Sequence, residues 1–351
     1  MLQPQSPFYR RNRLGAEAQR RYDLVIDAVR AHEEHLPEGT STDDWTAVAD
    51  HPELFWLQTL MSVDGGEFTI QYYDLTPDEI ALMQERIDRS TEMFLDLAPT
   101  DCSDWDKALY VYETVVRLVR YQEDVDGLAL IGRDATGVWR NGHDFSRTVY
   151  GPLAEHWGIC VGYANMVQYL LQRLGIECLT VSGKRKRGKG GHAWNLACLD
   201  GSYCFIDATF GRGWSVDETE RPAYCAHEWF GFSEDDVSDE GFYYQQVATI
   251  PWPERIGSEC DWFRRTGWFV DEFDPAQVDG LVERACTEGL RVLELKCATN
   301  ETRDEVRGWL EEHHHLTCFP HQLGAIAAPL VGSPRLAYVG ADGNPVVPGE
   351  S

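Results

Sequence analysis

The sequence predicts an α+β fold whose core is a helix that begins at a cysteine and packs on an antiparallel sheet carrying a histidine and an aspartate. Two observations predict this core. Apolar residues recur at helical spacing directly after Cys160, and two strand-like segments flank an Asp-Gly pair at 200–201. Turn-forming residues along the chain separate this core from an N-terminal helical region and a small C-terminal α/β domain.

The N-terminal region, 1–100, is expected to be mostly helical. Residues 15–35 have apolar side chains at helical spacing, and residues 66–73 alternate as a strand does. A second helix is expected to open at Thr76-Pro77, because proline fits the first helical position and acidic side chains favour the first turn.

The central domain, 101–250, is expected to open with an amphipathic helix that starts near Trp105. The prolines of Pro251-Trp252-Pro253 indicate a boundary. The C-terminal domain, 251–351, is expected to hold a helix near 275–288, a strand at 290–295, a helix at 302–313 and a hairpin that turns near 341–344.

Cys160 stands at the predicted start of the central helix, which is expected to end at Gly175. A thiol at a helix N-terminus faces unpaired backbone N–H groups and the positive end of the macrodipole, both of which favour the thiolate. The same N–H groups could stabilise an oxyanion. Gly158 and Gly162 lack side chains, so the chain can turn tightly into the helix and a substrate backbone can come close.

His192 and Asp207 are expected on two strands of one hairpin, 192–199 and 202–209, joined by a type I′ turn at Asp200-Gly201. In that register His192 and Trp194 share a face with Asp207. The Cβ atoms of His192 and Asp207 would then lie roughly 7 Å apart. At that separation a carboxylate can hold one imidazole nitrogen while the other faces a thiol. A turn one residue longer would shift the register and separate the pair.

The order Cys, His, Asp and the surrounding motifs resemble the transglutaminase-like superfamily, within the papain-like fold of cysteine enzymes, and its bacterial members in particular. The motifs lie between about 105 and 210, with a weaker match upstream at Asp50-His51-Pro52-Glu53-Leu54-Phe55-Trp56-Leu57. They are Ser146 to Ala164 around the cysteine, Leu174 to Cys178 and Val181 to Gly183 after it, His192-Ala193-Trp194-Asn195, and Asp200-Gly201 through Ile206-Asp207-Ala208-Thr209. The resemblance implies that Cys160 is the nucleophile, His192 the general base and acid, and Asp207 the orienting carboxylate.

Two positions depart from the bacterial pattern. Many of these relatives have an acidic residue where this chain has Val161, and many continue with Thr-Trp-Asp where it has Thr209-Phe210-Gly211. Both departures lie close to the proposed triad, so the substrate preference could differ. Tyr150, Trp157 and Trp194 are candidates for substrate binding or for the oxyanion site, with ordinary packing as the alternative role.

The triad predicts cysteine-dependent acyl transfer at amide bonds, with a protein or peptide as substrate. Hydrolysis by a peptidase or amidase is favoured, because amine transfer by a transglutaminase also needs a water-poor path for the amine. A non-catalytic binding or scaffold module on the same fold is the alternative from another class. An enzyme that cleaves glycan–asparagine amides would share the triad, but the cysteine pairs that bind zinc in that group are absent.

The formal net charge of −27 argues against nucleic acid and anionic membranes as partners. An exception is 184–189, which holds five cations just before His192. It is either a solvated loop or a rim that attracts acidic substrates. No cofactor and no metal site is predicted: His313 to His315 point in different directions, and Asp124-Val125-Asp126-Gly127 lacks the other ligands of a calcium loop.

The first ten residues lack the apolar core of a secretory signal, and no apolar run is long enough to span a membrane. Ten cysteines without regular spacing are typical of a reducing compartment rather than of a disulfide scaffold. A cytoplasmic location is therefore expected, while the oligomeric state stays open.

Overall fold

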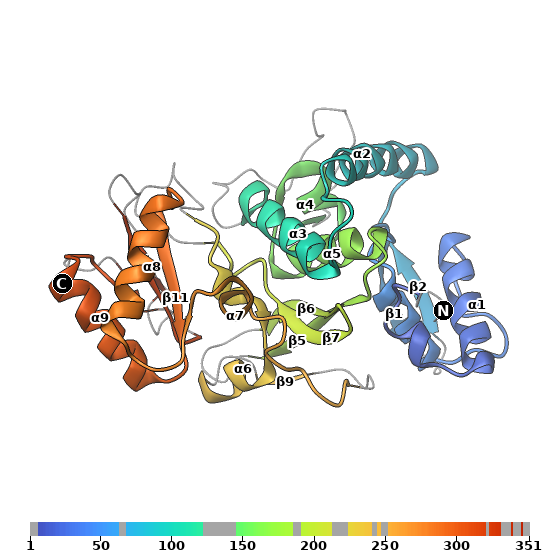
Figure 1. Cartoon of the computed structure of the whole chain (residues 1–351). Coiled ribbons are helices and arrows are strands. Elements are labelled where there is room, and N and C mark those ends of the chain that lie inside the picture. Colours follow the sequence, from blue (N-terminus) through green and yellow to red (C-terminus); the bar gives the residue numbers. More distant parts are fainter. Residues whose placement is uncertain are drawn as a thin grey trace. The chain divides into compact units, whose positions relative to one another are not determined.

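The chain folds as a mixture of helices and β-strands (Figure 1). The computed structural model describes residues 6–62, 68–121, 145–184, 191–212, 224–240, 244–246, 252–320, 323–330, 338–339 and 345–346. Two compact units are present: the first comprises Met1–Ser182, Ala193–Asp200 and Val247–Trp252, and the second comprises Gly183–His192, Gly201–Gln246 and Pro253–Ser351. The division at residues 100 and 250 that the sequence suggests stays a prediction.

The helical elements carry the labels of Figure 1. The α-helices are α1 (Ala16–Arg30), α2 (Pro77–Asp96), α3 (Asp104–Leu118), α4 (Tyr150–Glu155), α5 (Cys160–Arg173), α6 (Glu234–Glu240), α7 (Trp262–Thr266), α8 (Pro275–Thr287) and α9 (Asn300–His313). Short 3₁₀ helices are η1 (Arg11–Arg13), η2 (Asp44–Asp50), η4 (Phe145–Arg147) and η6 (His227–Trp229).

The strands form several sheets. A five-stranded sheet has the order β8 (Phe230–Phe232), β7 (Ser202–Ile206), β6 (Gly191–Leu199), β5 (Cys178–Lys184) and β9 (Tyr244–Gln246). A four-stranded sheet has the order β10 (Phe269–Val270), β11 (Val292–Cys297), β13 (Ala325–Pro329) and β12 (Phe319–Pro320). The two-stranded pairs are β1 (Leu57–Ser62) with β2 (Phe68–Tyr72), β3 (Arg120–Tyr121) with β4 (Trp157–Gly158), and β14 (Tyr338–Val339) with β15 (Pro345–Val346).

The N-terminal part of the first unit has its own small core. Tyr22, Val25 and Val29 of α1 pack with Leu54 and Ile70, all of them buried. The antiparallel pair of β1 and β2 follows α1 in sequence. The prediction included β2 but missed β1, because 57–62 does not alternate between buried and exposed positions as a strand with one buried face would.

The helices that lead into the central region begin where the sequence predicts them. Thr76 and Glu79 form a reciprocal capping box at the start of α2, with Pro77 at the first helical position. Ser103 and Asp106 form the equivalent pair at the start of α3. Each pair satisfies N–H groups that the helix itself leaves without acceptors, which fixes the starting residue of the helix.

The predicted two-residue turn between β6 and β7 is confirmed. Asp200 and Gly201 have φ values of 51° and 85°, which is the left-handed pair that a type I′ turn requires. Glycine pays no steric penalty in this region, and aspartate is one of the side chains that tolerate it. The turn therefore sets which residues of 191–199 lie opposite those of 202–206.

The C-terminal part of the second unit is a small α/β structure, as the sequence predicts. Helices α8 and α9 lie beside β11 (Figure 1), and their apolar faces pack on Leu293 and Leu295. Strands β10 and β11 are parallel, whereas β13 pairs antiparallel with both β11 and β12. The predicted turn at 341–344 lies outside the described residues, but β14 and β15 on either side of it pair antiparallel.

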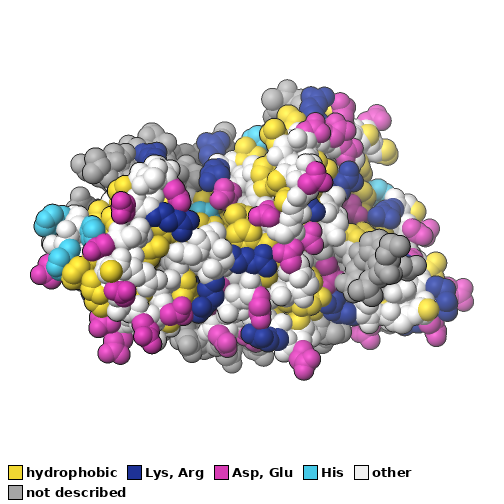
Figure 2. Space-filling model, in the orientation of Figure 1, with side chains coloured by type: hydrophobic (Ala, Val, Ile, Leu, Met, Phe, Trp, Pro, Cys, Tyr) yellow, Lys and Arg dark blue, Asp and Glu magenta, His cyan; other side chains and the backbone are white. Residues whose placement is uncertain are grey.

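All ten cysteines lie in described parts of the chain and none forms a disulfide. Asp and Glu side chains are spread over the face drawn in Figure 2, in keeping with the net charge of −27. No helix among the described residues is both long enough and apolar enough to cross a membrane.

Candidate active site

Cys160 is the first residue of α5, the position that the sequence predicts. Ile159 precedes it as the N-cap residue with extended backbone angles, and the Ile159 side chain makes no capping hydrogen bond. The first intrahelical bond runs from the Tyr163 N–H to the Ile159 carbonyl. Gly175, with φ of 81°, follows the last turn as predicted. Cys160 is half-buried. As the first residue of a 14-residue helix, it stands at the positive end of the helix dipole.

The glycines around Cys160 are required by the chain's own packing. A Cβ on Gly162 would lie 2.1 Å from the carbonyl oxygen of Ser146, and a Cβ on Gly158 would lie 3.1 Å from the same atom. That carbonyl also accepts a hydrogen bond from the Ile159 N–H at 3.1 Å. The predicted tight approach to the helix is therefore present, but the space beside Gly162 is filled by Ser146 and not by a substrate.

A row of amide side chains holds α5 in place, and sequence reasoning missed it. Asn165, Gln168 and Gln172 follow one another at helical spacing. Gln168 is fully buried, donates to the Ala49 carbonyl at 2.8 Å and accepts from the Thr180 N–H at 2.6 Å. Asn165 donates to the Arg147 carbonyl, so these amides join the helix to backbone groups of other segments and fix the rotation of α5 about its axis.

The upstream motif at Asp50-His51 supplies one of those segments. Gln172 donates to the Asp50 carbonyl at 3.0 Å. The Asp50 carboxylate accepts from the N–H groups of Arg10 and Arg11 and from the Tyr22 hydroxyl. Burial raises the pKa of Asp50 above its usual range even though these donors act to lower it. Asp50 is thus the centre of a buried polar network that is hydrogen-bonded to α5 through Gln172.

Asn195 joins strand β6 to the same helix. Its Nδ2 donates to the Ala164 carbonyl at 2.9 Å, and its side chain is almost completely buried. Ala164 lies one turn after Cys160. The Asn195 of the His-Ala-Trp-Asn motif therefore has a structural role in placing the start of α5, which the sequence alone did not assign.

His192 and Asp207 form a buried pair. Nε2 of His192 lies 2.7 Å from Oδ2 of Asp207, and both side chains are less than a tenth exposed. The other carboxylate oxygen, Oδ1, accepts from the backbone N–H groups of Thr209 and Phe210 at 3.0 and 3.1 Å. The structure thus brings together two of the three residues that the resemblance singles out, and it fixes the carboxylate from both sides.

An aromatic ring packs on the histidine of this pair. The Phe210 ring lies 4.4 Å from the His192 ring between centroids, and Trp229 packs on Phe210 at 5.0 Å. The Asp207 N–H also donates to the Trp229 carbonyl at 2.9 Å. Phe210 is one of the two positions that depart from the bacterial pattern, and its ring limits the orientations open to the imidazole.

Tyr150 is buried at the start of α4, and its hydroxyl is already engaged. It donates to Glu155 at 3.0 Å and accepts from Arg86, whose guanidinium also pairs with Glu155 at 2.6 Å. This arrangement favours the packing role over the oxyanion role for Tyr150. Trp157 is half-buried on β4, and Trp194 is buried on β6.

Three further sequence features are the basic segment, the Asp124-Val125-Asp126 motif and the histidine run at 313–315. Lys184 ends β5, and the rest of the basic segment lies outside the described residues, as do Asp124 and Asp126. His313 stacks on Trp309, and Nε2 of His314 lies 2.6 Å from Asp279. Within the described ranges no three acidic, histidine or cysteine side chains gather as metal ligands would.

The cysteines other than Cys160 include several that burial makes unreactive. Burial raises the pKa of Cys297 and of Cys318 to about 12, and it raises the pKa of Cys178 further. A thiol with such a pKa is almost entirely protonated at neutral pH and is a poor nucleophile. These residues are therefore internal references for the reactivity of Cys160.

The close approach at Gly162 predicts a specific sensitivity. Gly162→Ala should lower the free energy of unfolding by about 1–3 kcal/mol, because the new methyl group must displace a backbone carbonyl. Gly280→Ala on α8, where a Cβ meets nothing within 4 Å, should instead raise it by about 1 kcal/mol. Chemical denaturation of both variants measures the difference, and equal effects of the two substitutions would contradict the proposed packing.

Comparison with curated proteins finds the kyphoscoliosis peptidases of two organisms. The chain is 28% identical over 81 residues to the kyphoscoliosis peptidases of Mus musculus and Homo sapiens. The match covers 20% of this chain and only 12% of each relative. No protein-family model matches the sequence.

Three solved structures are similar over part of the chain. A TGase has 14% identity and a TM-score of 0.29, over 48% of each chain. A candidate cysteine protease from Cytophaga hutchinsonii has 14% identity and a TM-score of 0.25, over 43% of this chain and 61% of that one. A candidate protease from Parabacteroides distasonis has 11% identity and a TM-score of 0.24, over 44% and 31%.

Proposed function

We propose that the chain is a transglutaminase-like cysteine enzyme that cleaves amide bonds by covalent acyl transfer. The observation that carries the proposal is the buried His192–Asp207 pair, in which both carboxylate oxygens are held. Cys160 would complete it as the nucleophile at the start of α5. Asn195 supports this grouping, because it lies on the strand of His192 and donates to Ala164, one turn from Cys160.

The pair sets the protonation of the imidazole. An ionised carboxylate only accepts, so the 2.7 Å contact requires that Nε2 of His192 carry a proton. In the neutral ring Nδ1 is then the basic nitrogen, and it is the atom proposed to face Cys160. After proton transfer, Asp207 stabilises the imidazolium, which keeps the thiolate–imidazolium pair populated.

The proposed reaction has two stages. Sγ of Cys160 bonds to the amide carbonyl carbon, and the C–N bond breaks as Nδ1–H of His192 protonates the leaving amine. Water then attacks the thioester carbon, His192 takes its proton, and the thiolate leaves. Backbone N–H groups at the start of α5 are the proposed oxyanion donors, with Trp157 and Trp194 as further substrate contacts.

Hydrolysis is the proposed outcome, with a protein or peptide substrate. A half-buried thiol is accessible to water, whereas amine transfer needs a path from which water is excluded. The curated relatives that match part of the chain are peptidases. Amine transfer is therefore the second candidate, and the basic segment at 184–189 is a proposed attraction for acidic substrates.

A non-catalytic binding module is the rival from another class. Such a module would have no need to bury a histidine against a carboxylate that is itself clamped by two N–H groups, because burying a charged group is costly. The buried His192–Asp207 pair therefore favours a catalytic role over a binding role.

Asp207→Asn tests whether Asp207 orients the His192 ring, and it keeps the backbone contacts of the side chain. The amide can still accept from Thr209 and Phe210 through Oδ1, but its NH₂ group then faces Nε2 of His192 and drives the ring proton to Nδ1. Activity should fall by about 10³–10⁴ in kcat, as it does when a triad histidine takes the wrong tautomer. The measurement is kcat together with the ¹⁵N shifts of His192.

Asp200→Asn is the matched control for that variant. It lies in the same hairpin, and Asn-Gly supports a type I′ turn as well as Asp-Gly does. Its kcat should equal that of the native chain. An Asp207→Asn variant that keeps native activity would rule out the orienting role of Asp207.

Trapping the acyl-enzyme tests the proposed nucleophile directly. Rapid acid quenching with an activated ester or amide substrate should give an adduct on the peptide that contains Cys160, and Cys160→Ala should give none. With glutamine-containing peptides and a fluorescent alkylamine present, free acid as the main product indicates hydrolysis, and labelled peptide indicates amine transfer. Turnover by Cys160→Ala at the native rate would refute the proposal.

A further inference from the structure

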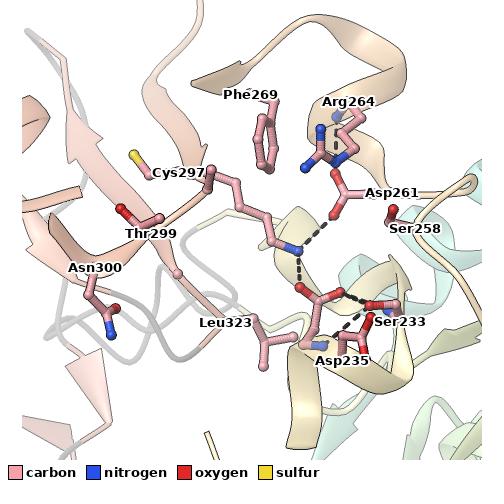
Figure 3. Close-up of a pocket in the computed structure, with 14 residues that line it drawn as sticks. Ser233, Asp235, Ser258, Asp261, Arg264, Phe269, Cys297, Thr299, Asn300 and Leu323 are labelled. Atoms are coloured by element: carbon pink, nitrogen blue, oxygen red, sulfur yellow. Dashed lines mark hydrogen bonds and ion pairs between the residues drawn. The ribbon is translucent and has the colours of Figure 1, made fainter. Parts of the chain in front are cut away.

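A cavity of about 490 Å³ lies within the second unit, and none of the proposed catalytic residues lines it (Figure 3). Its walls come from the start of α6, from α7 and the residues just before it, and from the segment that joins β11 to α9. The volume is in the range of ~300–1,000 Å³ that small-molecule sites occupy. The lining is mainly polar and holds charges of both signs.

Lys296 lines this cavity, although its side chain is only 6% exposed. Its Nζ donates to Asp236 at 2.6 Å and to Asp261 at 2.7 Å. Burial alone would lower the pKa of Lys296, but the two carboxylates raise it above its ordinary value, so the ammonium stays charged. An ammonium has three N–H donors, and the third has no acceptor among the residues that the structure describes.

The two carboxylates are fixed by further donors. Asp236 accepts from both the N–H and the hydroxyl of Ser233 at 2.7 Å, and Asp261 accepts from the Arg264 N–H at 3.0 Å. The two carboxylates that hold Lys296 are therefore themselves hydrogen-bonded by neighbouring residues of the same unit.

The N-terminus of α9 opens onto the same cavity. Thr299 caps the helix through the Thr302 N–H, and the first intrahelical bond is made by Arg303. The N–H groups of Asn300 and Glu301 precede that bond and favour a carboxylate. Arg264, which also lines the cavity, lies over the Phe269 ring at 3.6 Å.

We propose that this cavity binds a small zwitterion, a free amino acid or a short peptide, with its carboxylate at the start of α9 beside Lys296 and its ammonium beside Asp235. A ligand of one sign would face like charges, because Asp235, Asp236 and Asp261 line the same space as Lys296 and Arg264. A zwitterion meets the opposite charge at each end. This inference does not depend on the proposed acyl transfer.

Calorimetric titration of the full chain tests the proposal. The chain carries Cys160→Ala so that no peptide is consumed, and the probes are a panel of free amino acids and dipeptides, with propionate and ethylamine as half-ligands. At least one zwitterion should bind saturably and at least about tenfold more tightly than either half-ligand. The sizes that bind show whether the source is an amino acid or a peptide. No saturation by any zwitterion up to about 10 mM, or equal binding of a half-ligand, would overturn the proposal.

Asn300→Pro locates the carboxylate end. Proline suits the first position of a helix but lacks the N–H, so affinity should fall by roughly tenfold or more while the fold is kept. Asn300→Ala keeps the N–H and should bind no more than about threefold more weakly. Asp235→Asn, at an exposed position, should weaken the zwitterion but not propionate. If the Asn300→Pro and Asp235→Asn variants both bind the zwitterion as tightly as the native chain does, the cavity is not the binding site.

Discussion

The clamp on the Asp207 carboxylate is the interaction on which the candidate active site depends. The group is almost completely buried, and a buried charge is costly unless every oxygen has a donor. Here two backbone N–H groups hold Oδ1 and His192 holds Oδ2. The backbone donors come from Thr209 and Phe210 in the turn that follows β7, so the carboxylate is oriented before any substrate arrives. This is the preorganisation that general acid–base chemistry requires.

A second constraint acts on the position of Cys160, the proposed nucleophile. Helix α5 is held along its length by amide side chains such as Gln168, and its first turn is pressed against the Ser146 carbonyl at the place where only glycine fits. Apolar side chains in place of these amides would also pack against the neighbouring segments, but they would allow the helix to rotate or slide. Hydrogen bonds to fixed backbone atoms do not, and they determine where the Cys160 thiol lies.

The local parts of this arrangement could be predicted from the sequence. The start of α5 at Cys160, the capping of α2 and the turn at Asp200-Gly201 each depend on a few neighbouring residues. The partners of Gln168 could not be predicted, because Ala49 lies 119 residues away in the chain. The same holds for Lys296, whose two carboxylates are 60 and 35 residues distant and follow no motif. Long-range pairs of this kind are set by the tertiary fold and leave no periodic trace.

The central claim is that Cys160 and His192 form a poised thiolate–imidazolium pair. The most direct test is the pH dependence of iodoacetamide alkylation at each cysteine of the native chain, read by peptide mass spectrometry and repeated with His192→Ala. The claim predicts that Cys160 reacts rapidly well below the ordinary thiol pKa of about 8.5 and loses this advantage without His192, while buried Cys297 and Cys318 stay slow. Alkylation of Cys160 with an unshifted profile, unchanged in the variant, would contradict it.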